Sequence, residues 1–508
     1  MMKINLHTNA VINHACILLV ASGAYFGTSN AFADDKKPKA TEAPAVSYTR
    51  PPFAAFSSQM QDGLLGGGKY AKPVWNLHDT LKLPDWLSLS IEQRTRYETM
   101  DGRFNANAKG GDQQIPLQLD VALEARWGQW RLGGEFLDAR QLGADSGSGV
   151  NNTHVDMADF IQGYIAWANQ NVNYSGLGLE VVAGRQTLNL GSRRLVARNV
   201  FRNTINSFTG GKLRITDYSH WQFTGFVTMP VLRDPLTSAE ILSDVDRFDE
   251  EDSHTLFSGG FFEWNNLAWN INSELYLYHL DEGDNPDIQT RNRRYFTPGG
   301  RLFLKPTKGK FDFQVESIGQ FGTVRATTNA KDGKNLDHEA WMQHIDIGYT
   351  FEMPWTPRFA FEYDYASGDK NPNDGKDQRF DTLYGARRFE YGPTGIYGAF
   401  ARTNVNTPGY RINLAPRKDV QLMLSHRAFW LAESKDSWGG TGLQDKTGSS
   451  GSYIGQQLEL SARYDFNSSL NFETGWTHLF KGEFAKNAPS APNGQDVDYF
   501  FVQSLLRF

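Results

Sequence analysis

The last nine residues, Phe500-Phe501-Val502-Gln503-Ser504-Leu505-Leu506-Arg507-Phe508, decide the fold class of this chain. Counted back from Phe508, Leu506, Val502 and Phe500 fall on one face of a strand, and Ser504 is the only interruption. The other face carries Phe501, Gln503, Leu505 and Arg507. Outer-membrane β-barrels habitually end in this way, because the last strand closes the barrel and its aromatic residue sits at the membrane interface. The alternative is an aromatic terminus that arose by chance.

The amino-terminus predicts export from the cytoplasm. Lys3 supplies a positive charge, an apolar run covers 15–21, and Ala31-Phe32-Ala33 forms a small-residue cleavage site before Asp34. We therefore expect residues 1–33 to be a secretory signal peptide. Cys16 is the only cysteine and lies too early for a lipoprotein anchor, so we expect a mature chain without thiols, as suits an oxidising compartment.

Composition favours a strand-built membrane protein. No later stretch approaches the 18 consecutive apolar residues of a membrane helix, yet 13% of residues are aromatic and 49 are glycine. Lipid-facing residues that alternate with polar lumen-facing ones give this balance. Without Lys3, 50 Lys and Arg stand against 57 Asp and Glu, a net charge of −7 (50 − 57) that argues against nucleic acid as a partner.

The chain divides into a leader and a long run of alternating strands. Residues 34–85 are rich in Pro, Gly and Ala and predict a flexible periplasmic leader or a lumen insert. From Trp86 onward, period-2 segments are broken by Gly, Asp and Asn clusters. Over 117–127, for example, Leu, Val, Ala and Trp alternate with Gln, Asp, Glu and Arg. We predict an all-β fold, a transmembrane antiparallel β-barrel over residues 86–508.

Loop lengths give the expected strand number. Tight turns alternate with long polar inserts, which distinguishes the periplasmic from the extracellular end of a barrel. About 23 residues per strand accommodate 18 strands, and roughly ten residues cross the membrane. Sixteen strands would also fit, whereas an odd number would not place both ends in the periplasm. The predicted long loops are 101–115, 138–155, 233–255, 281–299, 325–339, 367–381, 434–452 and 482–496.

Arginines recur at positions that the alternation places in the lumen. The densest basic stretch runs from 185 to 202. Arginine stays charged and offers a planar fork of donors to carboxylates, so a ladder of arginines suits a pore for acidic sugars. A structural role remains open for each one, because lumen carboxylates such as Glu92, Glu124, Glu135, Glu362, Glu459 and Asp465 could pair with them. The candidate substrate-binding residues are Arg94, Arg96, Arg126, Arg131, Arg185, Arg193, Arg194, Arg214, Arg427 and Arg463.

Signals for catalysis or metal binding are weak. The sequence lacks G-x-S-x-G, H-E-x-x-H and P-loop motifs, and His338, His344, His426 and His478 are scattered. The acidic loops 281–287 and 369–377 suggest calcium, but Asp374 stands where an EF-hand loop needs glycine. We expect no catalytic residue, no cofactor and no metal, with solvated acidic loops.

Several motifs, taken in order, resemble the alginate export family of outer-membrane porins. They are Val182-Ala183-Gly184-Arg185-Gln186-Thr187-Leu188, the loop 367–375 with the following 379–385, Tyr453-Ile454-Gly455-Gln456-Gln457-Leu458-Glu459-Leu460, and the terminal Leu506-Arg507-Phe508. The resemblance spans about 86–508. It implies an 18-stranded monomeric barrel whose arginine-lined pore passes the anionic polyuronate alginate. Arg185, in the Gly-Arg-Gln motif, is the only residue of this chain to which the resemblance assigns a position in that pore.

The predicted function is a passive, substrate-selective channel in the bacterial outer membrane for an anionic polysaccharide or acidic oligosaccharide. Its other expected partners are outer-membrane lipid and the barrel-assembly machinery, which would recognise the strand that ends at Phe508. The alternatives are a porin for other small solutes, an outer-membrane barrel enzyme with a rim active site, and an anchoring barrel plugged by its leader.

Overall fold

The computed structural model describes residues 73–508 except 146, 200, 244, 286–287 and 493. The predicted signal peptide and most of the predicted leader, Cys16 included, lie outside the described residues. The strands are β1 (Leu87–Asp101), β2 (Asp112–Trp127), β3 (Trp130–Leu142), β4 (Asp156–Asn169), β5 (Gly178–Gln186), β6 (Phe208–Thr216), β7 (Trp221–Leu232), β8 (Glu250–Glu251), β9 (Thr255–Ala268), β10 (Ile271–Glu282), β11 (Arg294–Leu304), β12 (Phe311–Arg325), β13 (Asn335–Thr350), β14 (Arg358–Ala366), β15 (Lys376–Asp377), β16 (Val405–Arg417), β17 (Val420–Trp430), β18 (Tyr453–Asp465), β19 (Leu470–Lys481) and β20 (Val497–Arg507).

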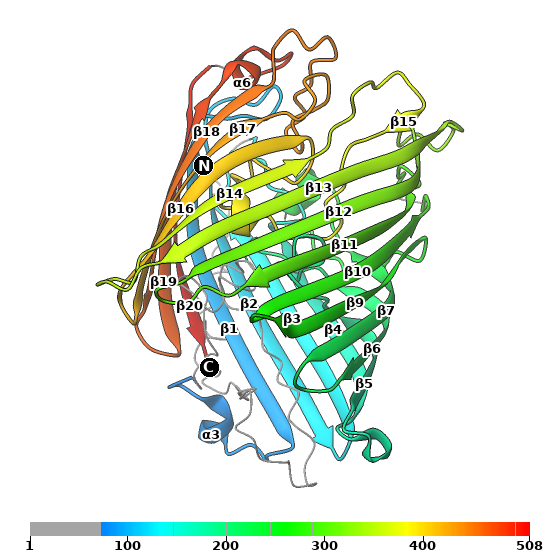
Figure 1. Ribbon diagram of the computed structural model, residues 1–508, viewed down its shortest axis with the longest axis vertical. Coiled ribbons are helices and arrows are strands. Elements are labelled where there is room, and N and C mark those ends of the chain that lie inside the picture. Colours follow the sequence, from blue (N-terminus) through cyan, green and yellow to red (C-terminus); the bar gives the residue numbers. More distant parts are fainter. Residues whose placement is uncertain (1–72, 146, 200, 244, 286–287, 493) are drawn as a thin grey trace, which may run out of the picture.

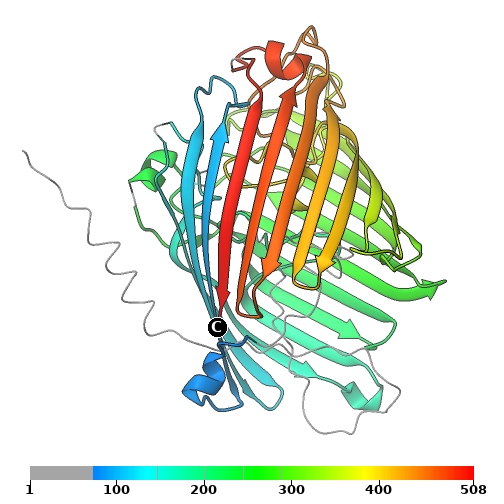
Figure 2. The same ribbon diagram turned by 90° about the vertical axis from the view of Figure 1, so that its left-hand side faces the viewer.

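These strands form a closed antiparallel barrel. Apart from the two-residue strands β8 and β15, eighteen strands of the described chain pair in sequence order (20 − 2), which confirms the larger of the two expected numbers. The ring closes because β20 pairs with β1, with Gln503 opposite Arg96 and Phe501 opposite Glu98. Figure 2 shows β20 between β19 and β1. Closure leaves the large sheet without an unpaired edge.

The two ends of the barrel differ, as predicted. Short turns such as 128–129 and 418–419 join strands at the lower end of Figure 1, and long connections rise at the upper end. The helical segments are short: α3 (Leu77–Leu81), a 3₁₀ turn (Val172–Tyr174), α4 (Ser238–Leu242), α5 (Arg388–Tyr391) and α6 (Glu483–Asn487). In the part of the chain that the structure describes, no helix has the length and apolar character to cross a membrane.

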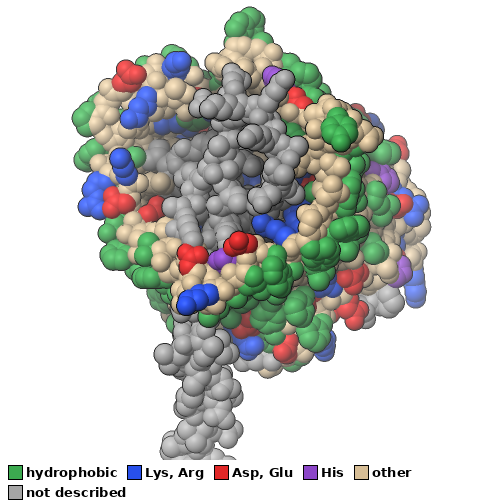
Figure 3. Space-filling view, turned by 90° about the horizontal axis from the view of Figure 1, so that it is seen from below, with side chains coloured by type: hydrophobic (Ala, Val, Ile, Leu, Met, Phe, Trp, Pro, Cys, Tyr) green, Lys and Arg blue, Asp and Glu red, His purple; other side chains and the backbone are tan. Residues whose placement is uncertain are grey.

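The predicted faces are confirmed along the terminal strand. Phe500 and Val502 point outward and are about 40% exposed (39% and 42%), whereas Phe501, Gln503 and Arg507 are buried toward the lumen. Other strands likewise expose apolar side chains outward and bury polar ones toward the lumen. Figure 3 shows hydrophobic side chains on the outer wall. Exposed aromatic residues gather beside the short turns: Trp127, Trp130, Trp269, Trp355 and Phe466. An apolar outer wall with an aromatic girdle is the form of a barrel embedded in lipid.

Several strands extend farther into the upper rim than the sequence predicts. The insert expected at 325–339 is a connection of residues 326–334, and the one expected at 281–299 spans 283–293. Beyond the lipid the outer face of a strand meets water, so polar residues replace apolar ones on that face while backbone pairing continues. The first residues of β13 show this, because Asn335, Asp337 and Glu339 are exposed yet paired with β12.

The short helix α3 ends the predicted leader and packs on the barrel. Asn76 caps it by accepting a hydrogen bond from the backbone N of Asp79 (3.1 Å). Leu77 is buried against Ile91 of β1, and the ring of Trp75 lies 6.3 Å from that of Phe508. The carboxy-terminal residue is therefore covered by the segment that precedes the first strand.

Candidate functional site

Two long connections fold into the lumen. Residues 187–207 join β5 to β6, and residues 367–404 join β14 to β16. The rings of Phe201 and Phe501 lie 5.2 Å apart, and Phe400 stacks on Phe429 of β17. Tyr397 lies 5.4 Å from Tyr499 of β20. Aromatic packing against lumen-facing wall residues holds both segments, which we call the in-folded connections.

The two in-folded connections bind each other through their backbones. Tyr384 N donates to Leu195 O (2.9 Å), Ala197 N donates to Tyr384 O (3.1 Å) and Ala386 N donates to Arg193 O (3.0 Å). The side-chain amide of Asn206 donates to Ala197 O (3.1 Å) and to Tyr384 O (3.0 Å). The first of these connections is absent from the predicted long loops, and the second is 23 residues longer at its end than predicted (404 against 381). Together they form one partition inside the barrel.

The predicted arginines of β1 hold this partition against the wall. Arg94 Nη2 donates to Asn203 Oδ1 (3.0 Å) and to the carbonyl of Arg202 (3.1 Å). Arg96 donates to Glu98 (2.8 Å) and Gln503 (2.8 Å), and its guanidinium lies 3.9 Å from the ring centre of Phe201. Both side chains are almost completely buried.

Predicted arginines near the short-turn end share carboxylates. Arg131 and Arg214 both form ion pairs with Glu180, and Arg126 binds Glu124 (2.6 Å). Further around the wall, Arg463 binds Asp465 (2.8 Å).

The other predicted arginines also take part in the packing of the connections. Arg194 pairs with Glu316 and with Glu390 (2.8 Å), while Arg193 beside it is buried. Arg427 pairs with Asp364 (2.8 Å) and Glu362 (3.0 Å). Arg185 donates to Glu251 (2.7 Å) and Asp159 (3.3 Å), which holds the connection 233–254.

The six lumen carboxylates proposed as structural partners all bind arginine. The pairs are Glu92 with Arg507, Glu124 with Arg126, Glu135 with Arg198, Glu362 with Arg427, Glu459 with Arg388, and Asp465 with Arg463. The ten predicted arginines are thus spread over the barrel rather than gathered into one site. Their predicted contact with substrate stays a prediction.

A different group of arginines has no acidic partner. Arg202, Arg233 and Arg387 are half-buried, and within the described residues no carboxylate oxygen lies within 4.0 Å of their guanidinium nitrogens. Arg202 and Arg233 both donate to Asn206 Oδ1, the second at 3.2 Å. Arg387 donates to the carbonyls of Gly398 and Phe400 (both 3.3 Å). We call these three residues the basic centre.

Electrostatics separate the members of the basic centre: no carboxylate offsets the charge of Arg202 or Arg387 in the described chain, whereas Asp156 and Asp249 act on Arg233 from beyond ion-pair distance. Burial, and then the positive charges of Arg233 and Arg387, lower the pKa of Arg202 well below its usual range. Burial and the charge of Arg402 lower the pKa of Arg387 to about 10. Guanidinium groups remain charged even so. A negative ligand at this point would therefore relieve repulsion among like charges.

Sequence reasoning noted Arg202 in the basic stretch but missed Arg233 and Arg387. Both lie in connections between strands, where alternation gives no direction for a side chain. One usable signal was present. The basic stretch contains Leu195 and Val196, apolar residues that a solvated loop does not need and that are buried here.

The histidines do not assemble a catalytic group in the described part of the chain. His344 binds Asp364 (2.6 Å) and Gln314 (3.1 Å). The close serine–histidine contact, Ser219 to His220 (2.8 Å), is made within an exposed short turn. Asp217 meets the same Nδ1 atom (3.2 Å), so the relay order of a serine triad is not formed.

A cavity of about 540 Å³ opens among the upper connections. Three arginines line it, and each binds a carboxylate: Arg291 with Asp377 (2.5 Å), Arg293 with Glu282 (2.5 Å) and Arg379 with Asp436 (2.9 Å). In the first acidic loop considered for calcium, 281–287, Asp281 forms an ion pair with Arg294 and Asp284 forms one with Arg325. In the other loop, the Asp369 and Asp374 carboxylates accept backbone hydrogen bonds from Asn371 (3.4 Å) and Lys376 (2.7 Å).

Comparison with known proteins agrees with this architecture. The model of the alginate export family matches residues 85–497. No curated protein sequence matches the chain. Among solved structures, Acinetobacter baumannii OccAB1 is 12% identical with a TM-score of 0.53, covering 84% of this chain and 97% of its own. The Pseudomonas aeruginosa outer membrane protein OpdK is 10% identical with a TM-score of 0.52, covering 83% of this chain and 98% of its own. Pseudomonas aeruginosa OpdQ is 13% identical with a TM-score of 0.51, covering 83% of this chain and 97% of its own. These likenesses concern the fold.

Proposed function

The chain belongs to the alginate export family and forms a channel in the bacterial outer membrane, and from that premise we propose that it passively conducts an anionic saccharide of the alginate type. The solute would follow its gradient without covalent chemistry or cofactor. Selectivity would be set where the in-folded connections narrow the lumen.

The observation that carries this proposal is the basic centre. Three half-buried guanidinium groups have no carboxylate oxygen within 4.0 Å among the described residues, and for Arg202 and Arg387 no carboxylate offsets the charge from farther away either. Each sugar of a polyuronate carries a carboxylate, which a guanidinium fork binds with two parallel hydrogen bonds. Because the neighbouring wall arginines are already paired, the basic centre supplies the excess positive potential that such a polymer requires.

A second candidate is a channel for small organic acids. The cavity of about 540 Å³ among the upper connections has the size of a small-ligand site and is lined by Arg291, Arg293 and Arg379. A small carboxylate could exchange with the partners of these arginines. The same basic centre would then pass monomers rather than a chain of sugars.

The test is planar-bilayer conductance of the refolded protein across a salt gradient, with polyuronate added. We expect anion selectivity and block by the polymer. In the double variant Arg202→Gln/Arg387→Gln the block should weaken about tenfold or more, since a hydrogen bond to a charged group contributes about 1.5–3 kcal/mol.

The matched control is Arg417→Gln/Arg294→Gln, which removes the same two charges from exposed pairs with Asp419 (2.9 Å) and Asp281 (2.9 Å). Unchanged block in the double variant would refute the role of the basic centre. If monomeric uronate blocks as well as the polymer at equal carboxylate concentration, the small-acid channel is favoured.

A further inference from the structure

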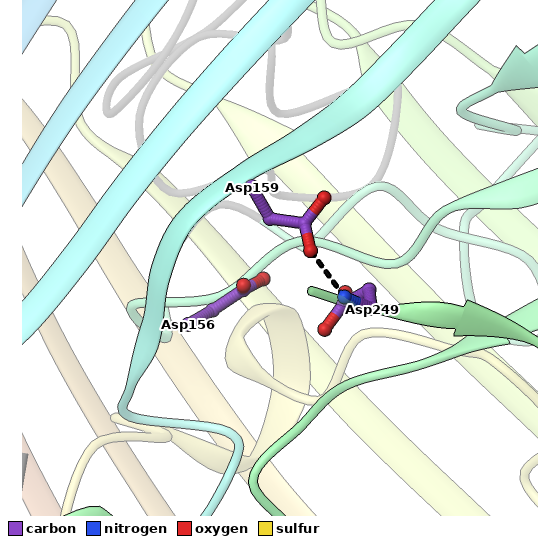
Figure 4. A group of neighbouring side chains, drawn as sticks. All are labelled: Asp156, Asp159 and Asp249. Carbon is purple, nitrogen blue, oxygen red and sulfur yellow. Dashed lines mark hydrogen bonds between the residues drawn. The ribbon is translucent and has the colours of Figure 1, made fainter. Parts of the chain in front are cut away.

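Three aspartates meet in a buried pocket below the upper connections. Asp156 and Asp159 belong to β4, and Asp249 lies immediately before β8. One carboxylate oxygen of each lies within 4.8 Å of the other two, and all three residues are buried. Figure 4 shows their side chains converging from two separate segments of the chain.

A β-bulge brings the two aspartates of β4 together. Strict alternation would direct residues three apart to opposite faces of a strand. Here Asp159 pairs with Leu137 and Asp156 with Ala139, so β4 has one residue more than β3, and Ala158 has a positive φ of 58°. The extra residue turns both carboxylates to the same side.

The three carboxylates are unequally satisfied. Asp159 accepts hydrogen bonds from the backbone N of Asp249 and of Phe160, and it pairs with Arg185 (3.3 Å). Asp249 accepts from the backbone N of Asp234 (2.9 Å). Asp156 is 1% exposed, and neither of its carboxylate oxygens has a hydrogen-bond partner in the described chain. Its side chain points into the cluster (Figure 4).

This arrangement requires a positive charge from outside the chain. A buried carboxylate without partners is strongly unfavourable, and here two like charges lie beside it. Arg185 pairs with Asp159 and also binds Glu251. Arg233 acts on Asp156 and Asp249 from beyond ion-pair distance, so two cations face four carboxylates. Negative charge therefore exceeds positive charge in the pocket.

We propose that Asp156, Asp159 and Asp249 bind a calcium ion. The ligand atoms are all carboxylate oxygens, which hard divalent cations prefer. Calcium–oxygen bonds of about 2.3–2.6 Å allow two oxygens on one ion to be up to about 5 Å apart, and the observed limit of 4.8 Å falls inside that range. The ion supplies the partner that Asp156 lacks.

The proposed ion joins β4 to the connection 233–254. That connection also carries Arg233, whose Nε donates to Asn152 O (2.9 Å) and whose Nη1 reaches Asn206 (3.2 Å). Calcium would thus fix the segment that positions one member of the basic centre. The site itself does not depend on what the channel conducts.

The test is calcium binding to the full chain, refolded in detergent free of lipopolysaccharide and treated with chelator. Calorimetric titration with CaCl₂ should show one site, and the temperature of thermal unfolding should rise with calcium. Asp156→Asn should lower the calcium affinity by about 10-fold or more. Removing a residue that only supports a metal ligand already costs about that much, and Asp156 is a proposed ligand itself. Its calcium-free unfolding temperature should equal or exceed that of the wild type, because repulsion is relieved.

Glu250→Gln is the control, since Glu250 is exposed, adjacent to the cluster and of the same charge. This variant should bind calcium like the wild type. Absence of binding to the wild-type chain, or equal affinity in Asp156→Asn, would overturn the proposal. Tighter binding of MgCl₂ than of CaCl₂ would overturn the assignment to calcium.

Discussion

The ion-paired arginines of the barrel wall differ in electrostatic state from two arginines of the in-folded connections, although others in these connections, such as Arg194 and Arg198, are ion-paired too. On the wall, Arg96 pairs with Glu98 and Arg427 with Glu362 and Asp364. In the in-folded connections, Arg202 and Arg387 bond to neutral oxygen atoms. The number of arginines in a lumen therefore says little about its potential. The partners of each arginine decide it.

The difference has a physical cause. A fully buried guanidinium loses its hydration, and a carboxylate at hydrogen-bond distance is needed to offset that loss. Strand register supplies such partners, since neighbouring strands fix which lumen-facing residues lie side by side. The basic centre keeps part of its hydration and needs no such partner. Pairing thus marks arginines that hold the fold, and under the proposed function the half-buried, unpaired arginines are the ones expected to contact a solute.

The largest loss of stability is expected on replacing Arg194, an arginine of an in-folded connection that is ion-paired as the wall arginines are. Arg194→Met takes the guanidinium partner of buried Glu316 away, while Glu390 keeps its pair with Arg402. The free energy of unfolding should fall by about 3–5 kcal/mol, as for other broken buried pairs. Urea unfolding followed by tryptophan fluorescence measures this loss.

The double variant Arg194→Met/Glu316→Gln provides the control, because it also removes the carboxylate charge that Arg194→Met deprives of its guanidinium partner. Part of the stability should return. If the two substitutions instead lower stability additively, the pairing does not hold the in-folded connections, and the comparison between wall and connections fails.

A second substitution converts a paired site into an unpaired one. Glu180→Gln removes the carboxylate shared by Arg131 and Arg214, with Lys212 close by on β6. Stability should decrease by about 1–3 kcal/mol, because buried donors lose a charged acceptor. The reversal potential in a salt gradient should shift toward stronger anion selectivity.

Glu240→Gln makes the same change of charge in the exposed turn of α4 and should leave the reversal potential unaltered. Equal shifts in both variants would mean that total charge, and not the pairing of lumen arginines, determines selectivity.

The sequence was sufficient for the parts of the fold that alternation governs. Phe500 and Val502 against Phe501 and Gln503 predicted both faces of β20 correctly, since lipid and lumen impose opposite preferences on neighbouring residues. The rim was less predictable. Asn335 begins β13 in water, where the outer face is polar, so the outward apolar periodicity of a lipid-facing strand is missing there.

The candidate site was less predictable than the fold because it depends on contacts between distant segments. Tyr384 and Leu195 bond through their backbones, and any residue type could make that contact. Arg233 and Arg202 meet at Asn206 only because two connections, 187–207 and 233–254, converge there. The presence of lumen arginines and of carboxylates to pair with them was predictable from alternation, but the arginines left without a partner were not.

The smallest effect is expected at Arg463, a predicted substrate-binding residue paired with the half-exposed Asp465 near a short turn (2.8 Å). A pair that reaches water contributes about 0–1 kcal/mol, so Arg463→Gln should change stability by no more than that. Because its charge is already neutralised, block by polyuronate should stay as in the wild type. Block weakened as much as in Arg202→Gln/Arg387→Gln would show that an ion-paired arginine can exchange its carboxylate for that of a sugar. Pairing would then no longer separate structural from solute-binding arginines in this lumen.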